Sequence, residues 1–290
     1  MTAIRSIAAL LLAAALLIAG NGLQSTLLAV RAELEGFPLA LIGLLMSAYY
    51  VGFIVGCRRG PRLIQRVGHI RTFTALASLV SAAALVHALI AEPVLWIALR
   101  VIAGFSMAGL YMIIESWINE SVDNASRGRV LAAYRIIDLS ALTAGQALLA
   151  VADPASFVLF SIISIIISLA LIPVALTNAA TPQPITKAQL DLGKMLAASP
   201  VAAAACFSAG AANGAFWAIG PVFAQRLGYS VSEVSFFMSA VVIGGAVAQW
   251  PIGFLSDRFD RRFVIAGAAL TCVGASAAMA TFAGAAPIAL

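Results

Sequence analysis

Long apolar segments alternate with short polar breaks along the whole chain. Each segment reaches the length of about 20 residues that a helix needs to cross roughly 30 Å of hydrocarbon. Apolar runs of this length, in place of alternating ten-residue strands, exclude an outer-membrane barrel. The pattern predicts nine membrane-spanning helices, over about residues 6–30, 39–57, 72–91, 94–118, 128–150, 155–177, 197–224, 232–253 and 263–284.

Composition agrees with a chain that is mostly embedded in lipid. The sequence is 62% hydrophobic and 10% charged, whereas roughly a quarter of a soluble domain is charged. Arg5 precedes the first apolar segment as in a signal peptide, but that segment exceeds the apolar region of about 7–15 residues in such peptides. The three cysteines lack the spacing of a zinc site or a disulfide framework. We therefore predict an all-α integral membrane protein without cofactors.

Basic residues gather on one side of the predicted membrane. If the N-terminus is cytoplasmic, thirteen of the seventeen lie in inside segments, and only Arg31 and Arg226 lie in outside loops. This bias satisfies the positive-inside rule and predicts a cytoplasmic N-terminus. The net charge of +5 then reflects topology, and a nucleic-acid partner has no support.

The sequence repeats internally at an offset of 192 residues. Residues 33–56 align without gaps on residues 225–248, and the matches include Gly36 with Gly228, Met46-Ser47-Ala48 with Met238-Ser239-Ala240, Gly52 with Gly244 and Val55 with Val247. One fixed register over two helices indicates duplication. An even number of spans between the copies makes them parallel repeats, which predicts six helices plus six.

The offset also predicts how the chain divides. Partners of residues 94–177 would fall at about 286–369, beyond Leu290, so nine of twelve expected helices are present. We predict an N-terminal six-helix bundle over 1–178, a cytoplasmic loop over 179–196 and a partial second bundle over 197–290.

A motif between the eighth and ninth predicted helices carries a family resemblance. Residues 253–262, GFLSDRFDRR, resemble the G-x-L-x-D-R-x-G-R-R signature of the major facilitator superfamily, except that Asp260 takes the place of the second glycine. The first-half copy over residues 61–69 is weaker, because Gln65 holds the acidic position and Pro61 the first glycine. Arg100 and Gly104 are similar to the family's R-x-x-x-G pattern.

The resemblance covers the entire chain and implies a helical-bundle transporter. Arg127-Gly128-Arg129, Gly145-Gln146 and residues 115–119 look like an uncharacterised bacterial branch that is grouped with sugar or drug transporters. The gating and motif residues that it implies are Arg66, Gly68, Arg100, Gly253, Asp257, Arg258, Arg261 and Arg262.

Asp257 is the acidic residue of the stronger motif. A carboxylate at the cytoplasmic end of one helix can approach the positive N-terminus of another. By analogy with the family, its target is the start of the fifth helix around Gly128 and Arg129, which would make a latch that closes in one transport state. The alternative is an anchor that sets topology only.

Several ionisable groups fall inside the predicted spans, where each is costly unless it faces a cavity or a partner. Arg135 and Asp138 share one helix face, and Glu115 lies at a comparable depth. This cluster binds substrate, carries a coupling proton, or simply braces two helices. We expect Arg100 nearer the outer side, where it pairs with a periplasmic carboxylate or extends outward; the resemblance suggests proton-linked gating.

Polar residues on the first and seventh helices suggest a central cavity. Asn21 and Gln24 share a face, and Asn213 and Trp217 occupy the repeated location. Such amides suit a neutral or weakly charged solute at the repeat interface, or alternatively they hold helices together. The cavity candidates are Asn21, Gln24, Tyr111, Glu115, Arg135, Asp138, Asn213 and Trp217.

These features favour a secondary active transporter that moves a small solute across the bacterial inner membrane by alternating access, with proton coupling. We expect a monomer in the lipid bilayer. No ATP-binding or hydrolase motif occurs in the sequence, so an enzyme is not expected. The alternative is a non-transporting fragment, or a membrane-embedded binding or regulatory protein, because helices ten to twelve are missing.

Overall fold

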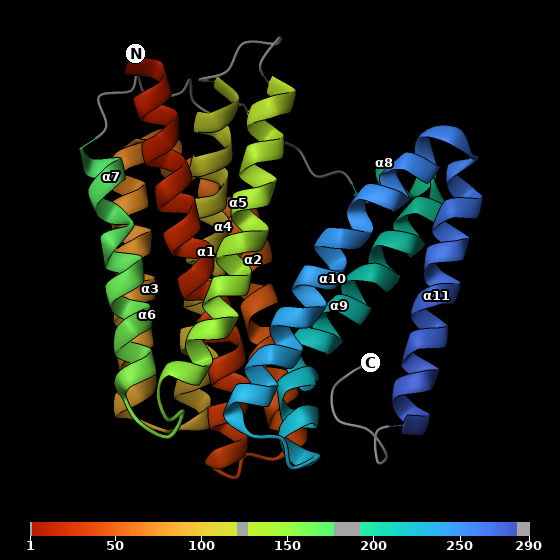
Figure 1. The fold of residues 1–290 in the computed structure, drawn as a ribbon. Coiled ribbons are helices and arrows are strands. Elements are labelled where there is room, and N and C mark those ends of the chain that lie inside the picture. The colour runs from red at the N-terminus through yellow and green to blue at the C-terminus, as the bar shows by residue number, and fades with distance from the viewer. Residues whose placement is uncertain (1, 121–126, 177–191, 283–290) are drawn as a thin grey trace.

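The computed structural model describes residues 2–120, 127–176 and 192–282, and within these ranges the chain is helical and contains no strand (Figure 1). The elements are α1 (Thr2–Leu34), α2 (Leu39–Val67), α3 (His69–Leu89), α4 (Pro93–Glu120), α5 (Arg127–Ala147), η1 (Leu148–Val151), α6 (Val158–Leu169), α7 (Leu171–Ala175), α8 (Leu192–Ala198), α9 (Pro200–Arg226), α10 (Val231–Arg258) and α11 (Arg261–Phe282).

Helices α1 to α7 form a packed bundle around a continuous apolar core. Glycines let two of its helices approach closely. A Cβ atom on Gly52 of α2 would lie 2.0 Å from the carbonyl oxygen of Val101, and one on Gly104 of α4 would lie 1.9 Å from that of Tyr49. Small residues at helix crossings are the usual basis of tight packing in membranes.

The helices repeat at the offset found in the sequence. Helix α1 ends at Leu34 and α9 at Arg226, α2 begins at Leu39 and α10 at Val231, and α3 begins at His69 and α11 at Arg261. Each of these pairs is 192 residues apart. The connecting turns also match, because Gly36 and Gly228 have φ angles of 74° and 86°, which only glycine adopts freely. The predicted duplication therefore extends to backbone conformation.

Helices α9 and α10 contact the first bundle at one end only. Along α10, Val234 and Met238 are 1% and 0% exposed, whereas Val247 and Trp250 are 68% and 79% exposed. Helix α9 shows the same gradient from the exposed Val201 to the buried Val222. Figure 1 shows α9, α10 and α11 leaning away from the bundle. The end at which α9 and α10 are separated from the bundle, where α2 and α10 finish, is called the basic end. The other end is called the opposite end.

Seven described helices are long and apolar enough to cross a membrane: residues 8–34, 39–67, 69–89, 93–120, 158–175, 200–226 and 231–258. They correspond to seven of the nine predicted spans. Helices α5 and α11 occupy the other two places, but α5 does not meet the same measure and α11 contains a shorter apolar part. The count of nine spans stays a prediction. Most of the predicted central loop lies outside the described residues.

Candidate functional site

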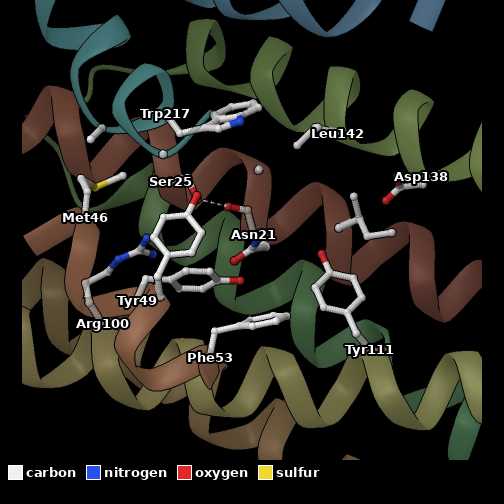
Figure 2. A pocket seen from close by; sticks show the side chains of 15 residues that line it. Asn21, Ser25, Met46, Tyr49, Phe53, Arg100, Tyr111, Asp138, Leu142 and Trp217 are labelled. Atoms are coloured by element: carbon white, nitrogen blue, oxygen red, sulfur yellow. Dashed lines mark hydrogen bonds between the residues drawn. The ribbon is translucent and has the colours of Figure 1, made fainter. Parts of the chain in front are cut away.

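A cavity of about 310 Å³ lies between the first bundle and α9. Its lining comes from α1, α2, α4, α5 and α9, and thus from both copies of the repeat. Figure 2 shows Arg100 and Asp138 on opposite sides of this space, with Trp217 of α9 across from the first bundle. The lining residues are Ile18, Asn21, Gly22, Ser25, Met46, Tyr49, Tyr50, Phe53, Arg100, Tyr111, Asp138, Leu142, Gly214, Trp217 and Ala218.

Arg100 lines this cavity and is only 2% exposed. Its guanidinium carbon lies 4.5 Å from the centre of the Tyr49 ring, which is a cation–π contact. The contact depends on glycine, because Gly104, one turn beyond Arg100, admits the Tyr49 backbone of α2. The R-x-x-x-G pattern therefore places a cation under an aromatic ring.

The expectation that Arg100 pairs with a periplasmic carboxylate or extends outward is wrong. The close crossing of α2 and α4 encloses the side chain, and no carboxylate pairs with Arg100 among the described residues. Its Nε and Nη1 atoms are buried and make no hydrogen bond within the same part of the chain.

Arg135, Asp138 and Glu115 lie together, as predicted. Arg135 Nη1 is 2.5 Å from Asp138 Oδ2, one turn apart on α5. All three residues line a second cavity of about 390 Å³, together with Phe53, Cys57, Ala108, Tyr111, Met112 and Tyr134. Asp138 and Tyr111 line both cavities. The ion pair leaves Glu115 as the one carboxylate of the cluster without a cationic partner among the described residues.

The predicted polar candidates divide into two groups. Asn21, Tyr111, Asp138 and Trp217 line the central cavity. Gln24 is absent from that lining and is fully buried, and its side chain makes no hydrogen bond among the described residues. Asn213 is exposed and is absent from the lining. The spacing of these residues in the sequence did not define their directions closely enough, because successive side chains on a helix are rotated by about 100°.

Polar contacts close the opposite end. Arg226 at the end of α9 donates two hydrogen bonds to Glu33 of α1, at 2.8 and 3.1 Å. Nearby, Ser235 of α10 donates to the Gln146 carbonyl oxygen of α5 at 2.7 Å. The Gln146 side chain in turn joins α5 to α1, since it accepts from Thr26 and donates to the Gly22 carbonyl. The bonds of Arg226 and Ser235 connect the second copy of the repeat to the first bundle.

The signature residues lie at the basic end. Asp257 is exposed and makes no ion pair or hydrogen bond with a described residue. The side chains of its expected targets at positions 128 and 129, and that of Arg261, lie outside the described residues. Arg66, Gly253 and Arg262 are exposed, and Arg258 contacts the Phe254 ring at 4.1 Å.

The two copies of the signature use different residues at the same turn. Gly68 has a φ of 92° between α2 and α3. Its counterpart Asp260 instead accepts a hydrogen bond from the backbone N–H of Arg262 at 2.9 Å. Glycine supplies left-handed conformation, whereas aspartate satisfies a free N–H at the start of α11. The departure from the signature is therefore compatible with the turn.

Sequence reasoning missed the aromatic residues of the cavity. Tyr49, Tyr50 and Phe53 of α2 line it, but in an apolar segment they resembled ordinary lipid-facing or core side chains. It also missed the Glu33–Arg226 pair. A signal was available there, because these are ionisable residues at the ends of helices related by the repeat.

Curated relatives cover most of the chain. An uncharacterised MFS-type transporter, YcaD, of Escherichia fergusonii is 29% identical over 256 residues, which are 87% of this chain and 67% of that protein. YcaD of Salmonella heidelberg is 27% identical over 91% of this chain and 69% of its own length.

Solved transporters share the fold. The nucleoside transporter NupG matches with a TM-score of 0.71 at 15% identity, over 88% of this chain and 68% of NupG. A bacterial homolog of the human lysosomal transporter Spinster, in an inward-facing and unoccupied conformation, matches with a TM-score of 0.71 at 18% identity, over 89% of this chain and 64% of that one. The family model for the Major Facilitator Superfamily matches residues 10–290. The chain therefore belongs to the Major Facilitator Superfamily, as a multi-pass transporter protein of the bacterial inner membrane.

Proposed function

We propose that this protein is a secondary active transporter that carries a small solute across the inner membrane by alternating access. The observation that carries the proposal is the central cavity, which both copies of the repeat line and which polar contacts close at one end only. Sites of this architecture lie at the repeat interface. Asn21, Tyr111, Asp138 and Trp217 are the predicted residues that contact the solute.

Residues 1–178 form one moving body in this proposal, and residues 197–290 belong to the other, with 179–196 as the connection. The N-terminus is cytoplasmic, because basic residues concentrate at the end where α1 begins. The structure then corresponds to an inward-facing state, like the Spinster homolog. The transporter works as a monomer in the bilayer, and Asp257 holds the basic end shut in the outward-facing state.

Proton coupling is assigned to Glu115. It lines the second cavity without a cationic partner among the described residues, whereas Asp138 pairs with Arg135. The titratable and charged groups that share this cavity are Cys57, Tyr111, Tyr134, Arg135 and Asp138. Protonation of a carboxylate there changes the charge next to Tyr111 and Asp138, which also line the central cavity. The D-xylose-proton symporter, a more distant fold neighbour with a TM-score of 0.57, uses protons by its own description.

The test measures both ends of the protein at once. In a cysteine-free background, spin labels at Val67 and Phe259 report the basic end, and labels at Leu34 and Leu227 report the opposite end. All four residues are exposed. Pulsed dipolar spectroscopy in nanodiscs should resolve two distances at each end. The two ends should change in opposite directions as pH is varied.

Two variants test proton coupling separately from alternating access. Glu115→Gln should abolish the pH response while both distances remain, and Arg59→Gln, which removes an exposed charge at the basic end, should leave the response intact. An unchanged pH response in Glu115→Gln would reassign coupling away from this residue. A single distance at both ends under all conditions would exclude alternating access.

A further inference from the structure

The charge of Arg100 is not balanced by any described protein group. The side chain is 2% exposed, and no described carboxylate lies within ion-pair distance. Its Nε and Nη1 atoms have no hydrogen-bond partner there, and the Tyr49 ring is its one cation–π contact. Buried charges in proteins are normally paired, so this guanidinium has capacity for an anionic ligand.

The other charged group of the cavity does not supply that anion. Asp138 lies across the cavity from Arg100 (Figure 2) and is already paired with Arg135 at 2.5 Å. Among the described residues that line it, the central cavity therefore offers one unpaired charge, and that charge is positive. A cationic solute would be repelled, and a neutral one would leave the guanidinium without a counter-charge.

Aromatic rings form much of the remaining surface. Tyr49, Tyr50, Phe53, Tyr111 and Trp217 all line the cavity, and the rings of Tyr49 and Phe53 lie 6.1 Å apart. Such a surface favours a flat apolar body through stacking and edge contacts. The cavity volume of about 310 Å³ falls at the lower end of ligand pockets, which span roughly 300–1,000 Å³.

We propose that Arg100 is the anion-binding residue of the central cavity and that the solute is a small aromatic monocarboxylate. The carboxylate accepts hydrogen bonds from the guanidinium, a geometry in which Arg is often bidentate. The aromatic body lies among the tyrosine, phenylalanine and tryptophan rings. This inference rests on the proposed transport function and narrows it to a substrate class, in place of the neutral or weakly charged solute expected from Asn21, Gln24 and Asn213.

The test uses two probes of nearly equal shape, 2-naphthoate and its uncharged amide, 2-naphthamide. Binding to the purified chain in detergent is measured by calorimetry at low salt. We expect the carboxylate to bind at least about tenfold more tightly, because a hydrogen bond between two charged groups is worth more than a neutral one.

Four variants show which residue causes the preference for the carboxylate. Arg100→Gln should reduce it to within about twofold, whereas Arg100→Lys should retain part of it, because lysine keeps the charge but loses the fork geometry. Arg59→Gln, which removes an exposed positive charge from the same helix bundle, should leave it unchanged. Trp217→Phe should weaken both probes by a similar factor, since it alters the aromatic surface and no charge.

The outcomes are distinct. Equal affinity of wild-type protein for both probes, binding of neither probe, or an undiminished preference in Arg100→Gln would each overturn the inference. If Arg100→Gln fails to fold, the wild-type comparison of the two probes decides alone. None of these results tests alternating access, which the distance measurements judge separately; a chain that switches states but binds the amide as well as the acid remains a transporter of another substrate class.

Discussion

Helices α2 and α10 are copies of one sequence element that begin at equivalent positions but lie in different environments. Gly52 of α2 touches the α4 backbone so closely that a Cβ atom would lie 2.0 Å from the Val101 oxygen. Its repeat equivalent, Gly244 of α10, has nothing within 4 Å of that position among the described residues. Duplication therefore specifies where helices start, turn and stop, while burial depends on which helix packs beside each copy.

This difference in packing also distinguishes the two walls of the central cavity. Arg100 and Tyr49 belong to the closely packed first bundle, where backbone contacts between α2 and α4 hold their relative positions. Trp217 comes from α9, which contacts that bundle only toward the opposite end. One wall of the cavity thus belongs to a closely packed bundle and the other to a helix that contacts this bundle at one end only, an arrangement that suits the proposed rocking mechanism.

The largest expected effect breaks this contrast directly. Gly52→Ala forces a methyl group against the Val101 backbone and should destabilise the protein by about 1–3 kcal/mol, as overpacking does. Gly244→Ala is the matched control and should change stability by less than about 0.5 kcal/mol, as at other open sites. Thermal unfolding in one detergent measures both variants.

Equal effects of the two substitutions would contradict the comparison. Two equally large losses would mean that Gly244 is packed as closely as Gly52. Two negligible changes would mean that α2 and α4 are not in the close contact described above.

A second prediction concerns what the copies share. Gly36 and Gly228 both have left-handed φ angles, so alanine at either should cost about 1–2 kcal/mol. Asparagine, which tolerates this conformation, should cost less at both positions. Unequal effects in thermal unfolding would show that the turns differ in more than their surroundings.

Much of the fold was predictable because it depends on local and periodic features. Apolar length gave the positions of the helices, and the fixed offset gave the matching turns at Gly36 and Gly228. The environment of Arg100 was not predictable, since it depends on how closely α2 crosses α4. In the sequence alone, the glycine at position 104 looks the same whether another helix or lipid packs against it. The separate positions of Gln24 and Asn213 also depend on helix rotation, which sequence patterns define poorly.

A third prediction addresses the N-terminal cap that α10 has and α2 lacks. Ser230 accepts from the Glu233 N–H at 3.4 Å and Glu233 accepts from the Ser230 N–H at 2.7 Å, a capping box at the start of α10. The equivalent Pro38 makes no side-chain cap bond. Ser230→Ala should cost about 1 kcal/mol and Ser230→Asp much less. Equal losses in thermal unfolding would show that the side-chain oxygen does not contribute.

The smallest expected effect tests the contact that joins the two copies. Glu33 and Arg226 form a two-bond ion pair whose side chains are 20% and 52% exposed. Exposed pairs are worth about 0.2–1 kcal/mol, so Glu33→Gln should lower the inward-facing population relative to the outward-facing one by a factor of about 1.4 to 5. The distance between labels at Val67 and Phe259 measures this shift.

Three further variants show whether the shift comes from the ion pair between the helices. Arg226→Gln should have the same effect as Glu33→Gln, and the double variant should add little, because either change already removes the pair. Glu35→Gln is the control, since Glu35 pairs with Arg31 on α1 and does not reach α9. If Glu35→Gln shifts the distances as much as Glu33→Gln, the cause is charge at this end of α1. If only the Glu33 and Arg226 variants do, the ion pair itself favours closure of the opposite end.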